Sequence, residues 1–318
     1  MIETRKEIIN IMPNVILKTN ELTKRYKKDY ALKHVSMTVK KGEIYGLIGQ
    51  NGAGKSTMLR LVTGLAFPTN GSIELFGNEN RKELPYALKR IGAMIEQPAI
   101  YPNMTAVENL EVHRLQKGIP GKECIAKTLQ IVGLSHTAKK KAKNFSLGMK
   151  QRLGIAIALL SDPELLILDE PTNGLDPMGI VEIRELIKTL NREKGITVLI
   201  SSHILSELSQ LATKFGIIHK GKLLEELSSD ELNDKCRQYI RIKVDQPRLG
   251  VTVLEKYLQT TDFEVMNDGY IKLYQYIDDV RTLSKTLTDH GLIIEHLSQE
   301  GDSLETYFTK VIGGVDHE

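Results

Sequence analysis

The chain has few cysteines, little net charge and no long apolar run, each of which would have indicated a particular class of protein. Only two of its 318 residues are cysteines, Cys124 and Cys236, which fit no metal-binding spacing and suggest free thiols in a reducing compartment. The formal net charge is only +3, from 43 Lys and Arg against 40 Asp and Glu. No strong field therefore draws the whole molecule to nucleic acid, and we expect no nucleic-acid partner. The longest apolar runs, such as 155–160, fall far short of the roughly 20 residues that span a bilayer.

The length of the chain allows one large or two ordinary domains, and we expect two. Residues 1–13 have no apolar core of signal-peptide length, so we interpret them as a poorly ordered extension. A first domain is expected over 14–229, with a helical subdomain at about 98–160, and a second over 230–318. The protein is thus expected to be soluble, or peripheral to a membrane at most.

Residues 49–57 have the spacing GxxxxGK[ST], between an apolar run at 44–48 and a helical pattern from Met58. A buried strand, this loop and a helix form the context of a phosphate-binding loop. Backbone N–H groups of the loop converge on phosphates, Lys55 adds a positive charge and the Ser56 hydroxyl suits Mg²⁺. The loop therefore predicts binding of ATP or GTP. The expected contacts are Gly49, Asn51, Gly52, Ala53, Gly54, Lys55, Ser56 and Thr57.

Two further segments end in polar residues that suit the same site. The run 165–168 is a buried strand that delivers Asp169 and Glu170 at its carboxyl end. Asp169 is expected to hold Mg²⁺, and Glu170 to orient or deprotonate the attacking water. The apolar run 91–95 is followed by Gln97, which Pro98 leaves at a strand end facing the phosphates. We expect Gln97 to contribute to the metal site as well.

An aromatic residue ahead of a phosphate-binding loop is suited to stack on an adenine, because every base offers a π-face. Tyr26 is the first choice and Tyr30 the alternative. Strands are expected at 15–17, 35–39 and 72–76 around this segment.

The segment 144–153, Asn-Phe-Ser-Leu-Gly-Met-Lys-Gln-Arg-Leu, resembles the signature motif of ABC ATPases. Gln97 as the Q-loop, 174–176 as the D-loop and His203 as the switch histidine follow the order of that family. The resemblance covers about 15–229. It departs from the family pattern at Leu147 and Met149, and Lys27 follows Tyr26 where the family often has glycine.

The resemblance implies an α/β fold, the P-loop NTPase of ABC ATPase type, with a RecA-like core, an antiparallel β layer and the helical subdomain. It implies a head-to-tail homodimer that encloses two ATP molecules, each held by one subunit's phosphate-binding loop and by Ser146 and Gly148 of the other, with Asp176 beside them. His203 would hydrogen-bond the γ-phosphate, and Gln97 would report its presence to an integral-membrane permease subunit. The protein would then lie in the cytoplasm, on the inner face of the membrane.

Short segments after residue 230 alternate in the order β-α-β-β-α-β, with strands at 239–244, 263–266, 270–274 and 292–297 and helices at 253–258 and 280–289. This order predicts a small α+β ferredoxin-like domain. A final helix is expected from Ser303.

A single ATPase unit with this tail and a Ser-Leu-Gly-Met-Lys signature looks like the ATP-binding subunits of bacterial bacitracin-resistance and lantibiotic-immunity exporters. The expected function is an ATPase that drives such an exporter. The alternatives are a soluble non-transport ABC ATPase and a regulatory nucleotide-binding module. Glu170 and His203 argue against a non-catalytic module, and a single phosphate-binding loop argues against a translation-factor-like ATPase, which has two ATPase units.

Overall fold

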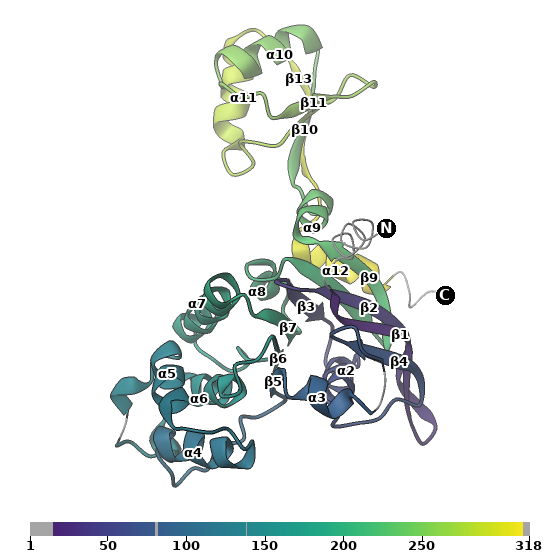
Figure 1. Ribbon diagram of the computed structural model, residues 1–318. Coiled ribbons are helices and arrows are strands. Elements are labelled where there is room, and N and C mark those ends of the chain that lie inside the picture. Colours follow the sequence, from purple (N-terminus) through teal and green to yellow (C-terminus); the bar gives the residue numbers. More distant parts are fainter. Residues whose placement is uncertain (1–14, 80–81, 138, 314–318) are drawn as a thin grey trace, which may run out of the picture. The chain divides into compact units, whose positions relative to one another are not determined.

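The computed structural model describes residues 15–79, 82–137 and 139–313, which divide into two units (Figure 1). The first unit ends at Ser229 and the second begins at Asp230. The extension expected at residues 1–13 lies outside the described residues. Within the described ranges, no helix has both the length and the apolar character needed to cross a bilayer.

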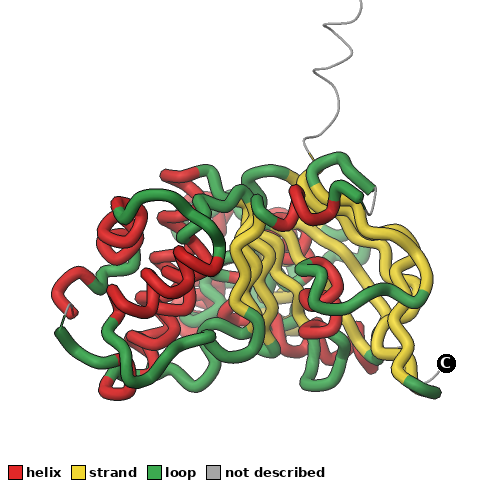
Figure 2. Tube along the Cα trace, turned by 60° about the horizontal axis from the view of Figure 1, so that its bottom comes forward, coloured by secondary structure: helices red, strands yellow, loops and turns green. Residues whose placement is uncertain are grey.

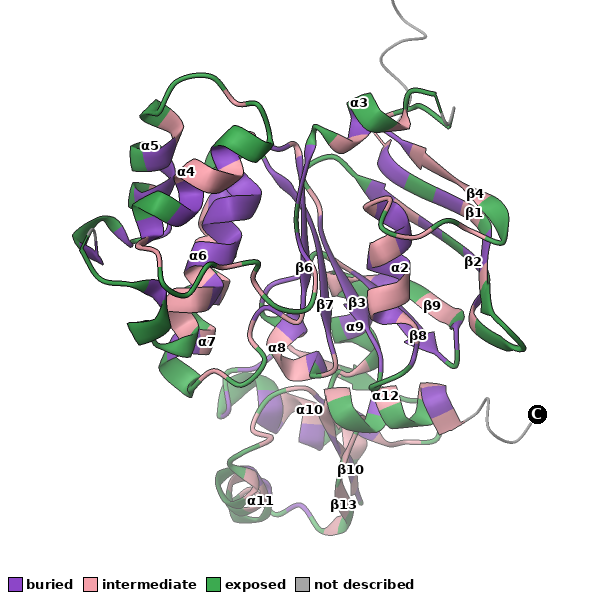
Figure 3. Cartoon of the chain, turned by 90° about the horizontal axis from the view of Figure 1, so that it is seen from below, coloured by how far each residue is buried: buried purple, intermediate pink, exposed green. Residues whose placement is uncertain are grey.

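The first unit is built on a six-stranded sheet in the order β5-β6-β7-β3-β8-β9. Its first five strands pair in parallel, and β9 is antiparallel to β8. Their bounds are β3 (Ile44–Ile48), β5 (Ile91–Met94), β6 (Leu165–Asp169), β7 (Thr197–Ser202), β8 (Lys214–His219) and β9 (Lys222–Ser228). Every residue of β3, β6 and β7 is buried, as Figure 3 shows, because helices cover both faces of a parallel sheet. The carboxyl ends of these strands consequently meet at one edge.

A second layer is the antiparallel sheet β2-β1-β4, made of β1 (Val15–Tyr26), β2 (Asp29–Lys40) and β4 (Asn70–Leu75). Helix α2 (Lys55–Val62) lies between this layer and the parallel sheet (Figure 3). Leu17 of β1, Leu47 of β3 and Met58 of α2 are fully buried in the same core cluster. The start of α2 is therefore held between two sheets.

Several helices gather on one side of the strands of this unit (Figure 2). They include α4 (Ala106–Gln116), α5 (Glu123–Ile131) and α6 (Leu147–Leu159), with short 3₁₀ turns at Ser135–Thr137 and Ala142–Asn144. Helix α4 begins with a capping box between Thr105 and Glu108. The other helices among the described residues of this unit are α3 (Leu84–Leu88), α7 (Pro177–Lys194) and α8 (Leu205–Ser209).

Two glycines let α6 pack closely on β5 and on the loop after it. A Cβ at Gly92 would lie 2.3 Å from the Ala158 carbonyl oxygen. A Cβ at Gly154 would lie 2.5 Å from the sulfur of Met94 and 2.8 Å from Cβ of Pro98. Any larger side chain would force the helix away from the strand.

The second unit carries the antiparallel sheet β11-β12-β10-β13. Its elements follow α9 (Ser229–Lys235) and are β10 (Tyr239–Val244), α10 (Pro247–Lys256), β11 (Phe263–Val265), β12 (Ile271–Leu273), α11 (Val280–Asp289), β13 (Ile294–Glu300) and α12 (Leu304–Gly313). Ile240, Ile242, Leu254 and Leu283 share its core. Between β10 and β13 the order is β-α-β-β-α-β, which supports the ferredoxin-like assignment, and we keep that assignment as a proposal.

Two element boundaries in this unit differ by more than two residues from those expected. Helix α10 begins at Pro247 rather than at Val253, because proline suits the first turn of a helix. Strand β13 runs to Glu300 rather than to Leu297, since its pairing with β10 continues to Tyr239.

Candidate functional site

The phosphate-binding loop connects β3 to α2 in a curled conformation that only glycine allows at two positions. A Cβ at Gly49 would lie 2.4 Å from the Ile218 carbonyl oxygen. Gly54 has a φ of 113°, and a Cβ there would lie 2.6 Å from the carbonyl oxygen of Ala31. Backbone atoms of β8 and β2 thus pack directly against the loop and hold its backbone in this curled conformation.

Lys55 is almost completely buried, with 4% of its surface exposed. Its Nζ donates hydrogen bonds to the carbonyl oxygens of Gly49 at 2.7 Å and Gln50 at 3.2 Å. It also forms an ion pair with Oε1 of Glu170 at 3.1 Å. In this conformation the lysine charge is satisfied by the protein itself.

The carboxyl end of β6 delivers two carboxylates, and one hydroxyl of β7 positions both. Ser201 Oγ donates to Oδ1 of Asp169 at 2.6 Å and accepts from the backbone N–H of Glu170 at 3.0 Å. Asp169 is buried, whereas the Glu170 side chain is 20% exposed. Sequence reasoning assigned no role to Ser201, although its position two residues before His203 on a buried strand was a signal for one.

His203 follows β7, and its Nδ1 lies 3.0 Å from Oε2 of Glu170. The Glu170 carboxylate therefore contacts Lys55 through one oxygen and His203 through the other. Lys55, Asp169, Glu170 and His203, named from sequence alone as parts of one site, lie together at the carboxyl edge of the sheet.

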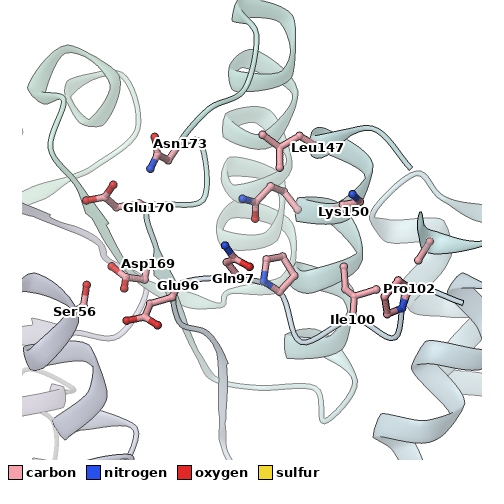
Figure 4. A pocket seen from close by; sticks show the side chains of 13 residues that line it. Ser56, Glu96, Gln97, Ile100, Pro102, Leu147, Lys150, Asp169, Glu170 and Asn173 are labelled. Carbon is pink, nitrogen blue, oxygen red and sulfur yellow. The ribbon is translucent and has the colours of Figure 1, made fainter. Parts of the chain in front are cut away.

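A cavity of about 700 Å³ opens beside these groups. Ser56, Gln97, Asp169 and Glu170 line it, together with Glu96 (Figure 4). The Ser56 hydroxyl and the Asp169 carboxylate are hard oxygen ligands of the kind that Mg²⁺ prefers. In the described ranges, no three His, Cys, Asp or Glu side chains are placed to hold a metal ion. Ser56 and Asp169 nevertheless fit Mg²⁺, because this ion binds one or two protein groups and completes its shell with phosphates and water.

A second hollow, of about 450 Å³, contains the residues expected from the signature and the D-loop. Ser146 caps α6 and accepts a hydrogen bond from the Met149 N–H at 3.3 Å. Asp176 caps α7 and accepts from the Gly179 N–H at 3.2 Å. Gly148 lines the same hollow. Within one chain, Ser146, Gly148 and Asp176 therefore line one hollow, and Ser56 and Asp169 line the other.

Tyr26 and Tyr30 lie on either side of the tight β1–β2 turn, and both are about half exposed. Arg25 pairs with Tyr30 across the hairpin, whereas Tyr26 pairs with Asp29. Because successive residues of a strand point to opposite faces, the two tyrosines project from opposite faces of the hairpin. They are therefore not interchangeable as an adenine platform.

A strand, phosphate-binding loop and helix in a parallel sheet, flanked by an antiparallel layer and a helical region, define a P-loop ATPase of the ABC type, as the sequence predicted. Residues 32–173 match the family model of ABC transporters. The chain is 48% identical over 304 residues to the bacitracin transport ATP-binding protein BcrA of Bacillus licheniformis, which spans 95% of this chain and 98% of that protein. The chain therefore belongs to the ATP-binding proteins of the ABC transporter family.

Two further comparisons agree with this assignment. The lantibiotic transport ATP-binding protein SrtF of Streptococcus pyogenes is 48% identical over 216 residues, covering 68% of this chain and 92% of that protein. Among solved structures, the dimeric post-hydrolysis state of the ATP-binding cassette MJ0796, bound to ADP and Pi, has a TM-score of 0.60 and 29% identity. The match covers 67% of this chain and 99% of the MJ0796 chain. These comparisons support ATP binding and hydrolysis.

Proposed function

We propose that the chain is the energy-coupling ATPase of a bacterial ABC exporter that removes antimicrobial peptides. Its similarity to bacitracin and lantibiotic transport ATP-binding proteins over most of their length supports this function. The exported molecule would be bound by a separate integral-membrane permease subunit, and the chain would dock on that permease at the inner face of the membrane.

The observation that carries the mechanism is the separation of the two residue sets in one chain. Ser56, Asp169 and Glu170 line one hollow, and Ser146 and Gly148 line another. A head-to-tail pair of chains would bring the second set of one copy over the ATP held by the first set of the other. The N–H groups at the start of α6 then face the γ-phosphate, which a helix N-terminus attracts. ADP lacks that phosphate, so hydrolysis loosens the pair.

Within the completed site each group has a distinct task. The loop N–H groups and Lys55 hold the β- and γ-phosphates. Ser56 and Asp169 would hold Mg²⁺, with Gln97 near them; the ion would neutralise phosphate charge. Glu170 orients or deprotonates the attacking water. His203 hydrogen-bonds the γ-phosphate.

The remaining predicted contacts surround the nucleotide at its two ends. Tyr26 would stack on the adenine, and the loop contacts expected from sequence, from Gly49 to Thr57, would enclose the phosphates. Asp176 of the second copy would lie beside the phosphate end.

The test is the Glu170→Gln variant, which keeps the shape of the side chain and removes the base. It should bind ATP, form a dimer in gel filtration and fail to hydrolyse. A Glu170→Gln chain that remains monomeric at saturating ATP would contradict the head-to-tail model. Co-purification of the wild-type chain with a membrane permease encoded beside it tests the transport role, and isolation of the chain on ribosomes or DNA would contradict it.

A further inference from the structure

One buried hydrogen-bond acceptor beside the candidate site is left without a donor. It is Oε1 of Gln151, on α6, and among the residues that the structure describes no group donates to it. Gln151 is only 6% exposed, so water does not readily replace the missing donor. An amide oxygen buried without a partner is unfavourable, and such atoms are rare in folded proteins. Gln151 also lines the 700 Å³ cavity, so a donor inside that cavity can serve it.

The packing of α6 shows which segment lies beside Gln151. At Gly154 the helix meets the loop after β5, where an added Cβ would lie 2.8 Å from Cβ of Pro98. Gln151 stands three residues before Gly154, and residues at this spacing share one face of a helix. Gln151 therefore lies on the face of α6 that meets this loop. The residue before Pro98 in the loop is Gln97, which lines the same cavity as Gln151.

Gln97 has the donor that Gln151 lacks. Its side chain is exposed in the cavity, and Figure 4 shows it between Asp169 on one side and Leu147 and Lys150 of α6 on the other. A glutamine amide accepts through its oxygen and donates through its nitrogen at the same time. Gln97 can therefore serve the metal ion with its oxygen and α6 with its N–H group.

We propose that Gln151 is the acceptor that links Gln97 to the signature helix when nucleotide is bound, a role that rests on the proposed ATPase function. With the Gln97 oxygen turned to the metal ion, its N–H group would donate to Oε1 of Gln151. Ser146 caps the same helix five residues earlier. The bond would therefore hold Ser146 in place for the ATP of the other copy. Gln151 is a positioning residue, because it would touch neither the nucleotide nor the metal ion.

The missing donor makes this link depend on the nucleotide. A ligand shifts an equilibrium between two positions of a helix only if it interacts differently with each. Oε1 of Gln151 is unsatisfied in the structure, and it becomes satisfied only when Gln97 is oriented to donate. Bound ATP and Mg²⁺ would supply that orientation. The position of α6 that suits the dimer is thus favoured when the nucleotide is present.

The test is a double-mutant cycle between Gln97 and Gln151, in chains that also carry Glu170→Gln so that ATP is not consumed. Analytical ultracentrifugation with ATP and Mg²⁺ measures the Kd of the dimer. Gln151→Met removes the amide and nearly keeps its shape. One hydrogen bond corresponds to about a fivefold change in an equilibrium constant, and a dimer has two such bonds. Gln151→Met should therefore raise Kd about 25-fold with Gln97 present, and less than about twofold in Gln97→Ala.

The melting temperature without nucleotide separates this role from a merely structural one. Gln151→Met should not lower it, because Oε1 has no donor among the described residues. Gln151→Leu, a second apolar substitution, should give the same result and the same cycle.

Asn109→Leu is the matched control, on the neighbouring helix α4. Asn109 is a fully buried amide whose oxygen accepts from the Tyr101 N–H at 2.7 Å and whose nitrogen donates to the Thr105 carbonyl oxygen at 2.9 Å. Because this amide is bonded, Asn109→Leu should lower the melting temperature. Its effect on the dimer should be the same with and without Gln97.

Three results would overturn the inference: an unchanged dimer in Gln151→Met, an equal loss with and without Gln97, and a lower melting temperature of both apolar Gln151 variants without nucleotide. Failure of the Glu170→Gln chain itself to dimerise with ATP would instead overturn the head-to-tail dimer of the proposed function. The two failures are therefore distinguishable.

Discussion

Replacing Glu170 by Gln should have opposite effects on the stability of the free chain and on its affinity for ATP. One carboxylate oxygen pairs with Lys55 and the other contacts His203. In the variant, the buried Lys55 ammonium keeps its two carbonyl acceptors and loses its counter-charge. The phosphates of ATP then become the counter-charge, and no ion pair has to be broken to receive them.

The size of both effects follows from the burial of the pair. Removing one partner of a fully buried ion pair costs about 3–5 kcal/mol, and a hydrogen bond to a charged group contributes about 1.5–3 kcal/mol. Because the Glu170 side chain is 20% exposed, we take about 2 kcal/mol. For a unit of this size, that lowers the melting temperature by roughly 4–8 °C. The same free energy corresponds to an ATP affinity up to roughly thirtyfold higher.

Differential scanning calorimetry without nucleotide and isothermal titration with ATP measure the two effects. Hydrolysis should fall by about 10²–10⁴-fold, as expected for loss of a general base. Glu207→Gln is a suitable control, because the Glu207 carboxylate accepts a hydrogen bond from Thr172 at 2.7 Å and forms no ion pair with Lys55. A Glu170→Gln chain with unchanged melting temperature and unchanged ATP affinity would refute the reasoning.

Three further predictions concern the nucleotide, the second copy and pH. Tyr26→Ala should lower ATP affinity by about 1–3 kcal/mol, measured by titration with a fluorescent ATP analogue; a comparable loss in Tyr30→Ala alone would move the adenine to the other face of the hairpin. Ser146→Ala should abolish ATP-dependent dimerisation in gel filtration while the monomer still binds ATP, and a dimer of normal strength would contradict the role of the signature. The hydrogen bond from the Thr105 N–H holds the pKa of Glu108 below its ordinary value of 4.5, so its contribution to stability is complete above that value and is lost as the pH falls. Urea unfolding between about pH 3 and pH 6 should show a weaker acid dependence in Glu108→Gln.

The parts of the site that follow from local sequence could be predicted. The phosphate-binding loop, and the buried strand that ends at Asp169, are determined by short-range patterns of glycine and apolar residues. These patterns also give the order of elements on which the ABC resemblance depends. What joins Lys55 to Glu170 is a pairing between residues far apart in the chain, and no local pattern reveals it.

The direction in which side chains point at strand ends could not be predicted from the sequence. A strand reverses the direction of its side chains at every residue, so a shift of one position exchanges Glu96 for Gln97. For this loop, those directions depend on the register of β5 against β6 and on the ion pair between Glu96 and Arg60. Both arise only when the sheet and α2 are assembled.

At Gly154, helix α6 lies close to Met94 and Pro98, so we take Gly154 as the point about which the helix would tilt. Ser146 stands eight residues before Gly154, so at 1.5 Å per residue the two are about 12 Å apart along the helix axis. A tilt on the order of 15°, similar to subunit rotations in switching proteins, would swing Ser146 by roughly 3 Å. That distance is comparable to a hydrogen bond. In the proposed head-to-tail pair, a small tilt of the helical region would therefore be enough to bring Ser146 to the γ-phosphate of the ATP held by the other copy, or to remove it.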